Sequence, residues 1–238
     1  MSGSNTARRA FPDGFVWGAA TAGHQIEGNN VNSDFWFLEN LEPTMFAERS
    51  GDACDSSHRY EEDIALLASL GLNSYRFSVE WSRIEPSRGR FSRAELDHYK
   101  RVVDRCHAHG VAPAVTFVHC TVPLWFARAG GWLNPDAPGL FARYCSTATR
   151  AFGDGLAFAF TLNEPQVGKV FRCIPGAEGY FGRQDPLALE VHAHAATLSH
   201  VERFVTMEHP DLDGMTPFVR TPKPSAAHLG EIARRNTL

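Results

Sequence analysis

An apolar run that ends in a carboxamide and a carboxylate is the stretch of this sequence whose residue types could do chemistry. Phe158-Ala159-Phe160-Thr161-Leu162 is followed directly by Asn163, Glu164 and Pro165. Such a run is typical of a strand buried on both faces, and the strand should stop at Pro165, which has no N–H to donate. In a barrel of parallel strands the carboxyl end of each strand faces the active site. Glu164 is therefore a candidate general acid/base; the alternative is that it opens an ordinary exposed loop.

Polar side chains also lie at the ends of the other apolar segments. Gln25 follows the first segment, Arg76 lies in the second, and His119 ends the third. The carboxyl ends of parallel neighbours meet at one rim, where Gln, His and Asn offer neutral donors and acceptors that match hydroxyl groups. Together with the flat faces of five tryptophans, these groups favour a sugar site over a phosphate site. The alternatives are a buried ion pair for Arg76, a core histidine for His119, and core packing for the tryptophans.

The elements that must position these groups alternate along the chain. Strands are predicted over residues 15–21, 72–78, 111–118 and 156–162, and helices over residues 57–70, 93–109, 137–152 and 186–207. Strands and helices that alternate in this way, at a spacing of roughly 35–45 residues, indicate βα units and a parallel sheet. Residues 28–55 have no clear period and are expected to form a long loop with short helical turns. The first strand is not followed by Gly-x-Gly-x-x-Gly, which excludes a dinucleotide-binding Rossmann fold.

The four predicted strands end at residue 162, which leaves 76 residues. A closed barrel needs eight strands and takes about 250 residues. Residues 216–224 carry three prolines and no strand pattern. The sequence therefore predicts an α/β chain that forms a partial barrel of about four βα units. We expect a flexible arm over residues 1–10, the barrel portion over residues 11–209 and a divergent tail over residues 210–238.

Bulk composition narrows the class of protein. The 238 residues carry a net charge of −4, which gives no basic field for nucleic acid or an anionic membrane. Neither a secretory signal nor a run of about 20 apolar residues occurs. Five cysteines without a Cys-x-x-Cys pair argue against a zinc site or a disulfide framework, and a cytoplasmic location is expected. His192 and His194 point to different helix faces, so no metal site and no cofactor are predicted.

Five segments in order resemble family 1 glycoside hydrolases, the β-glucosidase and β-galactosidase type. The resemblance runs from about residue 11 to about residue 200. The segments are Phe15-Val16-Trp17-Gly18-Ala19-Ala20-Thr21-Ala22-Gly23-His24-Gln25-Ile26-Glu27-Gly28, His58-Arg59-Tyr60-Glu61-Glu62-Asp63-Ile64, Tyr75-Arg76-Phe77-Ser78-Val79-Glu80-Trp81-Ser82-Arg83-Ile84-Glu85-Pro86, Gly130-Gly131-Trp132 and Thr161-Leu162-Asn163-Glu164-Pro165.

This resemblance implies a TIM (β/α)8 barrel and retaining hydrolysis of a β-glycoside or an oligosaccharide. Glu164 is similar to the family's acid/base, Asn163 to the residue that binds the sugar 2-hydroxyl, and Arg76 to the arginine beside the nucleophile. Gln25 and His119 correspond to positions that bind the glycone. The family usually continues after this histidine with Trp-Asp, whereas this chain has Cys120-Thr121.

A retaining mechanism also needs a second carboxyl group as nucleophile. The family carries it in a Thr/Ile-Glu-Asn-Gly motif, and no Glu in these 238 residues precedes Asn-Gly. Two hypotheses follow. The chain is a β-glucosidase-like hydrolase with Glu164 as acid/base, or it is a truncated, inactive half-barrel that binds sugar or has no independent function. In either case we expect the open barrel edges to meet a second copy or a complementary half.

Overall fold

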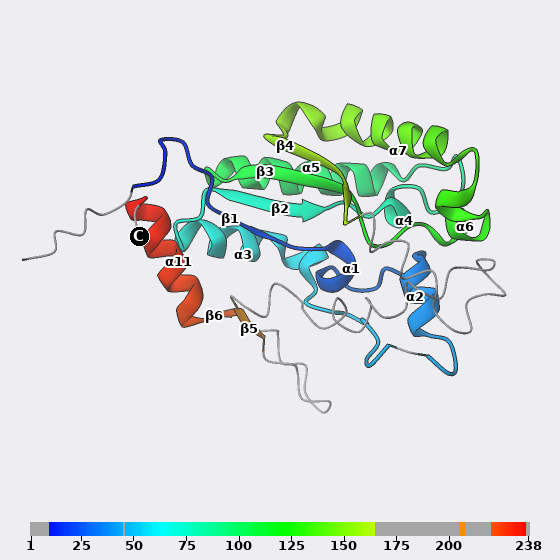
Figure 1. Cartoon of the computed structure of the whole chain (residues 1–238), viewed down its shortest axis with the longest axis horizontal. Coiled ribbons are helices and arrows are strands. Elements are labelled where there is room, and N and C mark those ends of the chain that lie inside the picture. Colours follow the sequence, from blue (N-terminus) through cyan, green and yellow to red (C-terminus); the bar gives the residue numbers. More distant parts are fainter. Residues whose placement is uncertain (1–9, 45, 165–204, 208–219, 237–238) are drawn as a thin grey trace, which may run out of the picture.

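In a computed structural model of the chain, the structure describes residues 10–44, 46–164, 205–207 and 220–236 (Figure 1). Four strands form one parallel sheet in the order of the sequence. They are β1 (Gly18–Ala20), β2 (Ser74–Ser78), β3 (Ala112–His119) and β4 (Phe158–Asn163). The described residues give three βα units and a fourth strand, in agreement with the predicted partial barrel, since sequential parallel strands joined by helices are the repeating unit of a (β/α)8 barrel.

The first strand is shorter than the predicted span of residues 15–21. Phe15 and Val16 lie before β1 and are 40% and 45% exposed. The ring of Phe15 lies 4.8 Å from the ring of Phe11 and 4.8 Å from the ring of Trp17. This aromatic cluster holds the segment beside the start of the sheet instead of in its hydrogen-bond ladder.

The three long helices predicted between the strands are confirmed. They are α3 (Ser56–Ser69), α5 (Arg93–Ala108) and α7 (Ala137–Phe152), and they run alongside the sheet in Figure 1. In α5 the hydroxyl of Ser92 accepts the backbone N–H of Glu95, a favourable N-terminal cap. Gly110, with φ of 68°, follows the end of α5 in a left-handed conformation that costs glycine little.

Short helices lie in the loops that follow β1, β2 and β3. They are α1 (Gly23–Ile26), α2 (Asp34–Glu39), α4 (Trp81–Ile84) and α6 (Leu124–Arg128), with a 3₁₀ turn at Gly131–Leu133. A second 3₁₀ turn, Gly153–Gly155, joins α7 to β4. The expected long loop over residues 28–55 therefore contains one short helix, α2. These loops follow the carboxyl ends of the strands, where an active site is expected.

The core lies between the sheet and the helices. Trp81 is 1% exposed, and its ring stacks on that of Tyr144 with centroids 4.8 Å apart and planes at 10°. The hydroxyl of Tyr144 donates to the carbonyl oxygens of Val79 and Phe117, which ties α7 to the segment after β2 and to β3. Trp81 is therefore a core residue, and its face is not available to a sugar.

The last described segments correct two predictions. Residues 186–204 of the predicted fourth helix lie outside the described residues, and Val205–Met207 forms strand β5. Strand β5 pairs antiparallel with β6 (Arg220–Pro222), inside the stretch for which no strand was predicted. Valine and threonine favour extended backbone, and two short strands can pair without the long apolar run used to identify the others.

Helix α11 (Pro224–Arg235) lies in the predicted divergent tail and packs back against the barrel portion. The backbone of α11 at Gly230 is so close to Leu70 that an added Cβ would lie 1.8 Å from its carbonyl oxygen. Arg234 Nη1 donates to the same oxygen at 2.8 Å. In Figure 1, α11 lies next to α3, at the amino ends of the strands. None of the helices in the described ranges could cross a membrane.

Candidate active site

Arg76 is held on three sides at the carboxyl end of the sheet. Its Nη2 donates to Asn163 Oδ1 at 2.8 Å, and its Nε donates to Thr116 Oγ1 at 2.8 Å. The guanidinium carbon lies 4.6 Å from the centroid of the Phe160 ring, a cation–π contact. Burial lowers the pKa of Arg76, and the negative charge of Glu164 opposes that shift. Neutral oxygens accept the hydrogen bonds of Arg76. Arg76 is therefore not held by a buried ion pair, which was the alternative considered from the sequence.

Strands β3 and β4 end at the same level. His119 and Asn163 are register partners in the parallel ladder, and both are half-buried. Glu164 comes next and is exposed, with φ of 43°. A left-handed backbone at a residue with a Cβ is uncommon, and such strained positions cluster at functional sites. The structure thus brings Arg76, Asn163 and Glu164 together, with His119 beside Asn163.

Gln25 lies at the same end of the sheet, on α1 directly after β1. The segment between β1 and α1 is bonded to β2, because the backbone N–H of Thr21 donates to the carbonyl of Arg76 at 2.9 Å. Gln25 is exposed, whereas His24 and Ile26 on either side of it are buried. Its side chain is therefore the one in this helical turn that is open to a ligand. The connection of Gln25 to the other four residues is by position at the rim, not by a direct contact.

Sequence reasoning missed two of the three residues that hold Arg76. Thr116 and Phe160 are register partners on β3 and β4. The period-2 alternation of strands places every second residue on the same face, so residues 158, 160 and 162 share one face of β4. That alternation was available in the sequence, but the unbroken apolar run of β4 concealed which face was inward.

A buried carboxyl group lies beneath the rim. Glu27 Oε2 lies 2.9 Å from Arg83 Nε, and Tyr99 donates its hydroxyl to the same carboxyl group at 3.0 Å. Burial raises the pKa of Glu27 from 4.5 to about 8; the Arg83 charge opposes this shift and the Glu80 charge adds to it. Burial is the largest of these effects, because removal from water penalises a carboxylate strongly. Glu27 is buried, and its contacts join the loop after β1 to α4 and α5.

Cys120 stands where the resemblance leads one to expect tryptophan. It is half-buried and has φ of 66°. Burial raises the pKa of its thiol to about 12, and the charge of Glu164 adds to the shift. The thiol therefore stays protonated near neutral pH and presents a small, neutral group at the rim. No group of three or more metal-ligating side chains was found among the residues that the structure describes.

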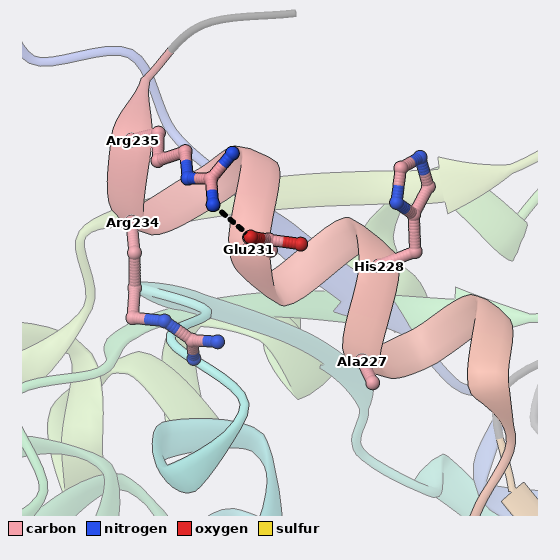
Figure 2. Close-up of a pocket in the computed structure, with 5 residues that line it drawn as sticks. All are labelled: Ala227, His228, Glu231, Arg234 and Arg235. Carbon is pink, nitrogen blue, oxygen red and sulfur yellow. Dashed lines mark hydrogen bonds and ion pairs between the residues drawn. The ribbon is translucent and has the colours of Figure 1, made fainter.

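A second hollow lies on α11, away from the rim (Figure 2). It is lined by Ala227, His228, Glu231, Arg234 and Arg235. Arg235 and Glu231 form an ion pair, and Arg234 turns away from them towards Leu70. Two of its charged groups pair within the helix, and Arg234 is bound to the backbone of Leu70.

The comparisons with known proteins agree on one family. The model of Glycosyl hydrolase family 1 matches residues 7–226. Thermostable beta-glucosidase B of Thermobispora bispora is 42% identical over 175 residues, which are 71% of this chain and 37% of that protein. Beta-glucosidase A of Acetivibrio thermocellus is 36% identical over 197 residues, which are 80% of this chain and 44% of that protein.

Two solved structures extend the comparison to the fold. The crystal structure of beta-glycosidase BGL167 is 47% identical with a TM-score of 0.67, and the match covers 94% of this chain and 51% of that one. The family 1 beta-glucosidase from Thermotoga maritima is 35% identical with a TM-score of 0.65, covering 68% of this chain and 39% of that one. The chain thus spans about half the length, or less, of the proteins that it matches.

Proposed function

Because the chain belongs to glycosyl hydrolase family 1, we propose that its rim binds a β-glycoside and that Glu164 is the acid/base of a retaining hydrolysis. One observation carries this proposal: Arg76 holds Asn163 at 2.8 Å, directly before Glu164 at the end of β4. The acid/base of such a reaction must stand at a fixed distance from the bond that it protonates. The immobilised residue before Glu164 supplies that fixed point.

Each rim residue has a role that fits a sugar. The Oδ1 of Asn163 accepts from Arg76, which leaves its NH₂ group to donate to a sugar hydroxyl. Gln25, after β1, and His119, beside Asn163 at the end of β3, would bind glycone hydroxyls. Glu164 would first donate a proton to the leaving oxygen and then take one from water.

The second half of the chemistry needs a second carboxyl group about 5–5.5 Å from the first. No Glu of this chain lies in a Glu-Asn-Gly motif. That observation supports a second candidate function, a half-barrel that binds a sugar without hydrolysing it. Turnover would then require a second carboxyl group from outside these 238 residues.

Binding and turnover of an aryl β-glucoside separate the two candidates. Binding without turnover above background would support the sugar-binding half-barrel, and we expect this result for the chain alone. Turnover on the order of 10 per second would support the hydrolase. Glu164→Gln should then lose about 10²–10⁴-fold on substrates with poor leaving groups. Glu61→Gln, on the outer helix α3, is the matched control. If the chain shows no binding and no turnover, both candidates are overturned.

A further inference from the structure

Glu80 is a buried carboxyl group on which several rim segments converge. It is 2% exposed and lies two residues after the end of β2, just before α4. Its Oε2 accepts the Nδ2 of Asn30 at 2.7 Å and the hydroxyl of Thr121 at 2.6 Å. Its Oε1 accepts the hydroxyl of Ser78 at 3.3 Å. A carboxylate is a pure acceptor, which suits a place where donors arrive from several directions.

The donors to Glu80 come from the loops that carry the candidate site. Asn30 belongs to the loop after β1, and Thr121 to the loop after β3. Ser78 extends the network to α1, because its hydroxyl accepts the backbone N–H of Gly23 at 2.7 Å. Gly23 lies so close to Glu80 that an added Cβ would be 2.6 Å from Oε1. Through these contacts Glu80 connects the turn that carries Gln25 with the loop that follows His119.

The contact with Thr121 holds a strained turn. The backbone N–H of Thr121 donates to the carbonyl of His119 at 2.8 Å, which closes a three-residue turn around Cys120. The central residue has φ of 66°, and γ-turns of that handedness are rare and strained. Strain of this kind persists only where surrounding contacts fix the backbone. The hydrogen bond from Thr121 to Glu80 is such a contact.

We propose that Glu80 is a positioning residue of the sugar rim, which fixes the turn of His119, Cys120 and Thr121 relative to the turn that carries Gln25. The proposal rests on the proposed function in one respect: the rim is taken to be the place where the sugar binds. Glu80 itself is buried beneath the rim, so it acts through the residues that it holds and does not touch the ligand.

The test uses variants that remove one hydrogen bond at a time. Thr121→Val keeps the shape of the side chain but cannot donate to Glu80, whereas Thr121→Ser keeps the hydroxyl. Glu80→Gln replaces one carboxylate oxygen by an NH₂ group, a donor, at a site where Asn30 and Thr121 already donate. The double variant Glu80→Gln/Asn30→Asp exchanges carboxylate and carboxamide and can re-form the bond between the two side chains. Thr147→Val removes a hydroxyl that donates within α7, and serves as the matched control.

The first measurement does not depend on sugar. Alkylation by iodoacetamide is followed by mass spectrometry at Cys120, with Cys106 and Cys145 as internal references, because burial raises the pKa of each of the three thiols to about 12. Thr121→Val and Glu80→Gln should speed alkylation of Cys120 alone, on the order of tenfold or more, as expected for the loss of one buried hydrogen bond to a charged group. Thr121→Ser should keep the slow rate. The exchanged double variant should stay fast, because the bond between positions 80 and 30 re-forms only with an NH₂ group in place of Oε2, the oxygen that also accepts from Thr121.

General loss of stability would speed alkylation at all three cysteines together, and that result would overturn the proposal. An unchanged rate at Cys120 in both Thr121→Val and Glu80→Gln would overturn it as well. The second measurement is the affinity for methyl β-D-glucoside, which should fall in the variants that loosen Cys120. If the parent chain binds no glucoside, the proposed function fails, and the alkylation result still decides whether Glu80 fixes the turn.

Discussion

His119 and Asn163 face each other across the last rung between β3 and β4, and each is followed by a residue with a left-handed backbone. Cys120 has φ of 66° and Glu164 has φ of 43°. Both strands therefore leave the sheet at the same level and in the same unusual way. The arrangement places the residue after each strand above the rim, where it can meet a ligand.

Arg76 should be intolerant of lysine. A lysine has one nitrogen, which cannot reach both Asn163 and Thr116 in the geometry of a guanidinium group. We expect Arg76→Lys to weaken glucoside binding about tenfold or more, since a hydrogen bond to a charged group is worth roughly 1.5–3 kcal/mol. Titration calorimetry measures the loss. Arg128→Lys is the matched control, because Arg128 also lies over an aromatic ring, that of Phe37, but on α6; an equal loss in both variants would contradict a specific role.

The raised pKa of Glu27 predicts a stability that falls with alkaline pH. The folded-state pKa of about 8 exceeds the usual 4.5, so the folded chain holds an extra proton between these values. The contribution of this proton to the free energy of unfolding is fully present below about pH 4.5 and is lost as pH rises through about 8. Thermal melts from pH 5 to 9 should show a decline that Glu27→Gln flattens. A decline of equal slope in the variant would assign it to other groups.

Close packing of α11 predicts opposite effects for two glycine substitutions. Gly230→Ala would place a Cβ 1.8 Å from the carbonyl oxygen of Leu70 and should release α11 from the barrel portion. A loss of roughly 1–3 kcal/mol in the free energy of unfolding is typical of such overpacking. Gly139→Ala on α7 meets nothing within 4 Å and should be neutral or stabilise the chain by up to about 1 kcal/mol. Urea unfolding compares the two; equal effects would contradict the docked position of α11.

The open edge of β4 predicts association. Phe158 and Phe160 are 46% and 42% exposed, and β4 has a strand neighbour on one side, β3, among the residues that the structure describes. Ladder groups that have no strand partner in the described part of the chain, beside exposed rings, favour edge-to-edge contact. We expect light scattering at micromolar concentration to give a mass above that of the monomer, 26.3 kDa. A monomer with a sharp, cooperative melt would refute this expectation.

The long elements could be predicted from the sequence because they repeat one pattern. Helices α3, α5 and α7 each show an apolar stripe, and Gly71 and Gly110 follow two of them in left-handed conformations. The position of Glu164 at the end of a strand could be predicted because Pro165, which follows it, cannot continue the strand. The family resemblance added the roles of Gln25, Arg76 and His119, and these roles stay predictions.

The contacts beneath the rim could not be predicted in the same way. Glu80 was visible as a polar residue after a strand, but its partners Asn30 and Thr121 lie 50 and 41 positions away along the chain. Only the packed loops bring them together. Helix α11 was not predicted. Its two buried residues, Ala226 and Gly230, are small and carry little hydrophobic signal, whereas Leu229 and Ile232 are half-buried.

The bond between Phe11 and Asn236 has a practical consequence. The backbone N–H of Phe11 donates to the carbonyl of Asn236 at 2.9 Å, and Asn236 Nδ2 donates to the carbonyl of Phe11 at 2.8 Å. Two positions 225 residues apart thus lie side by side at the amino ends of the strands, on the side away from the rim. A short linker could join them and a new break be opened in a surface loop, giving a circularly permuted chain. Attachment to a solid support at this point would leave the rim facing the solution.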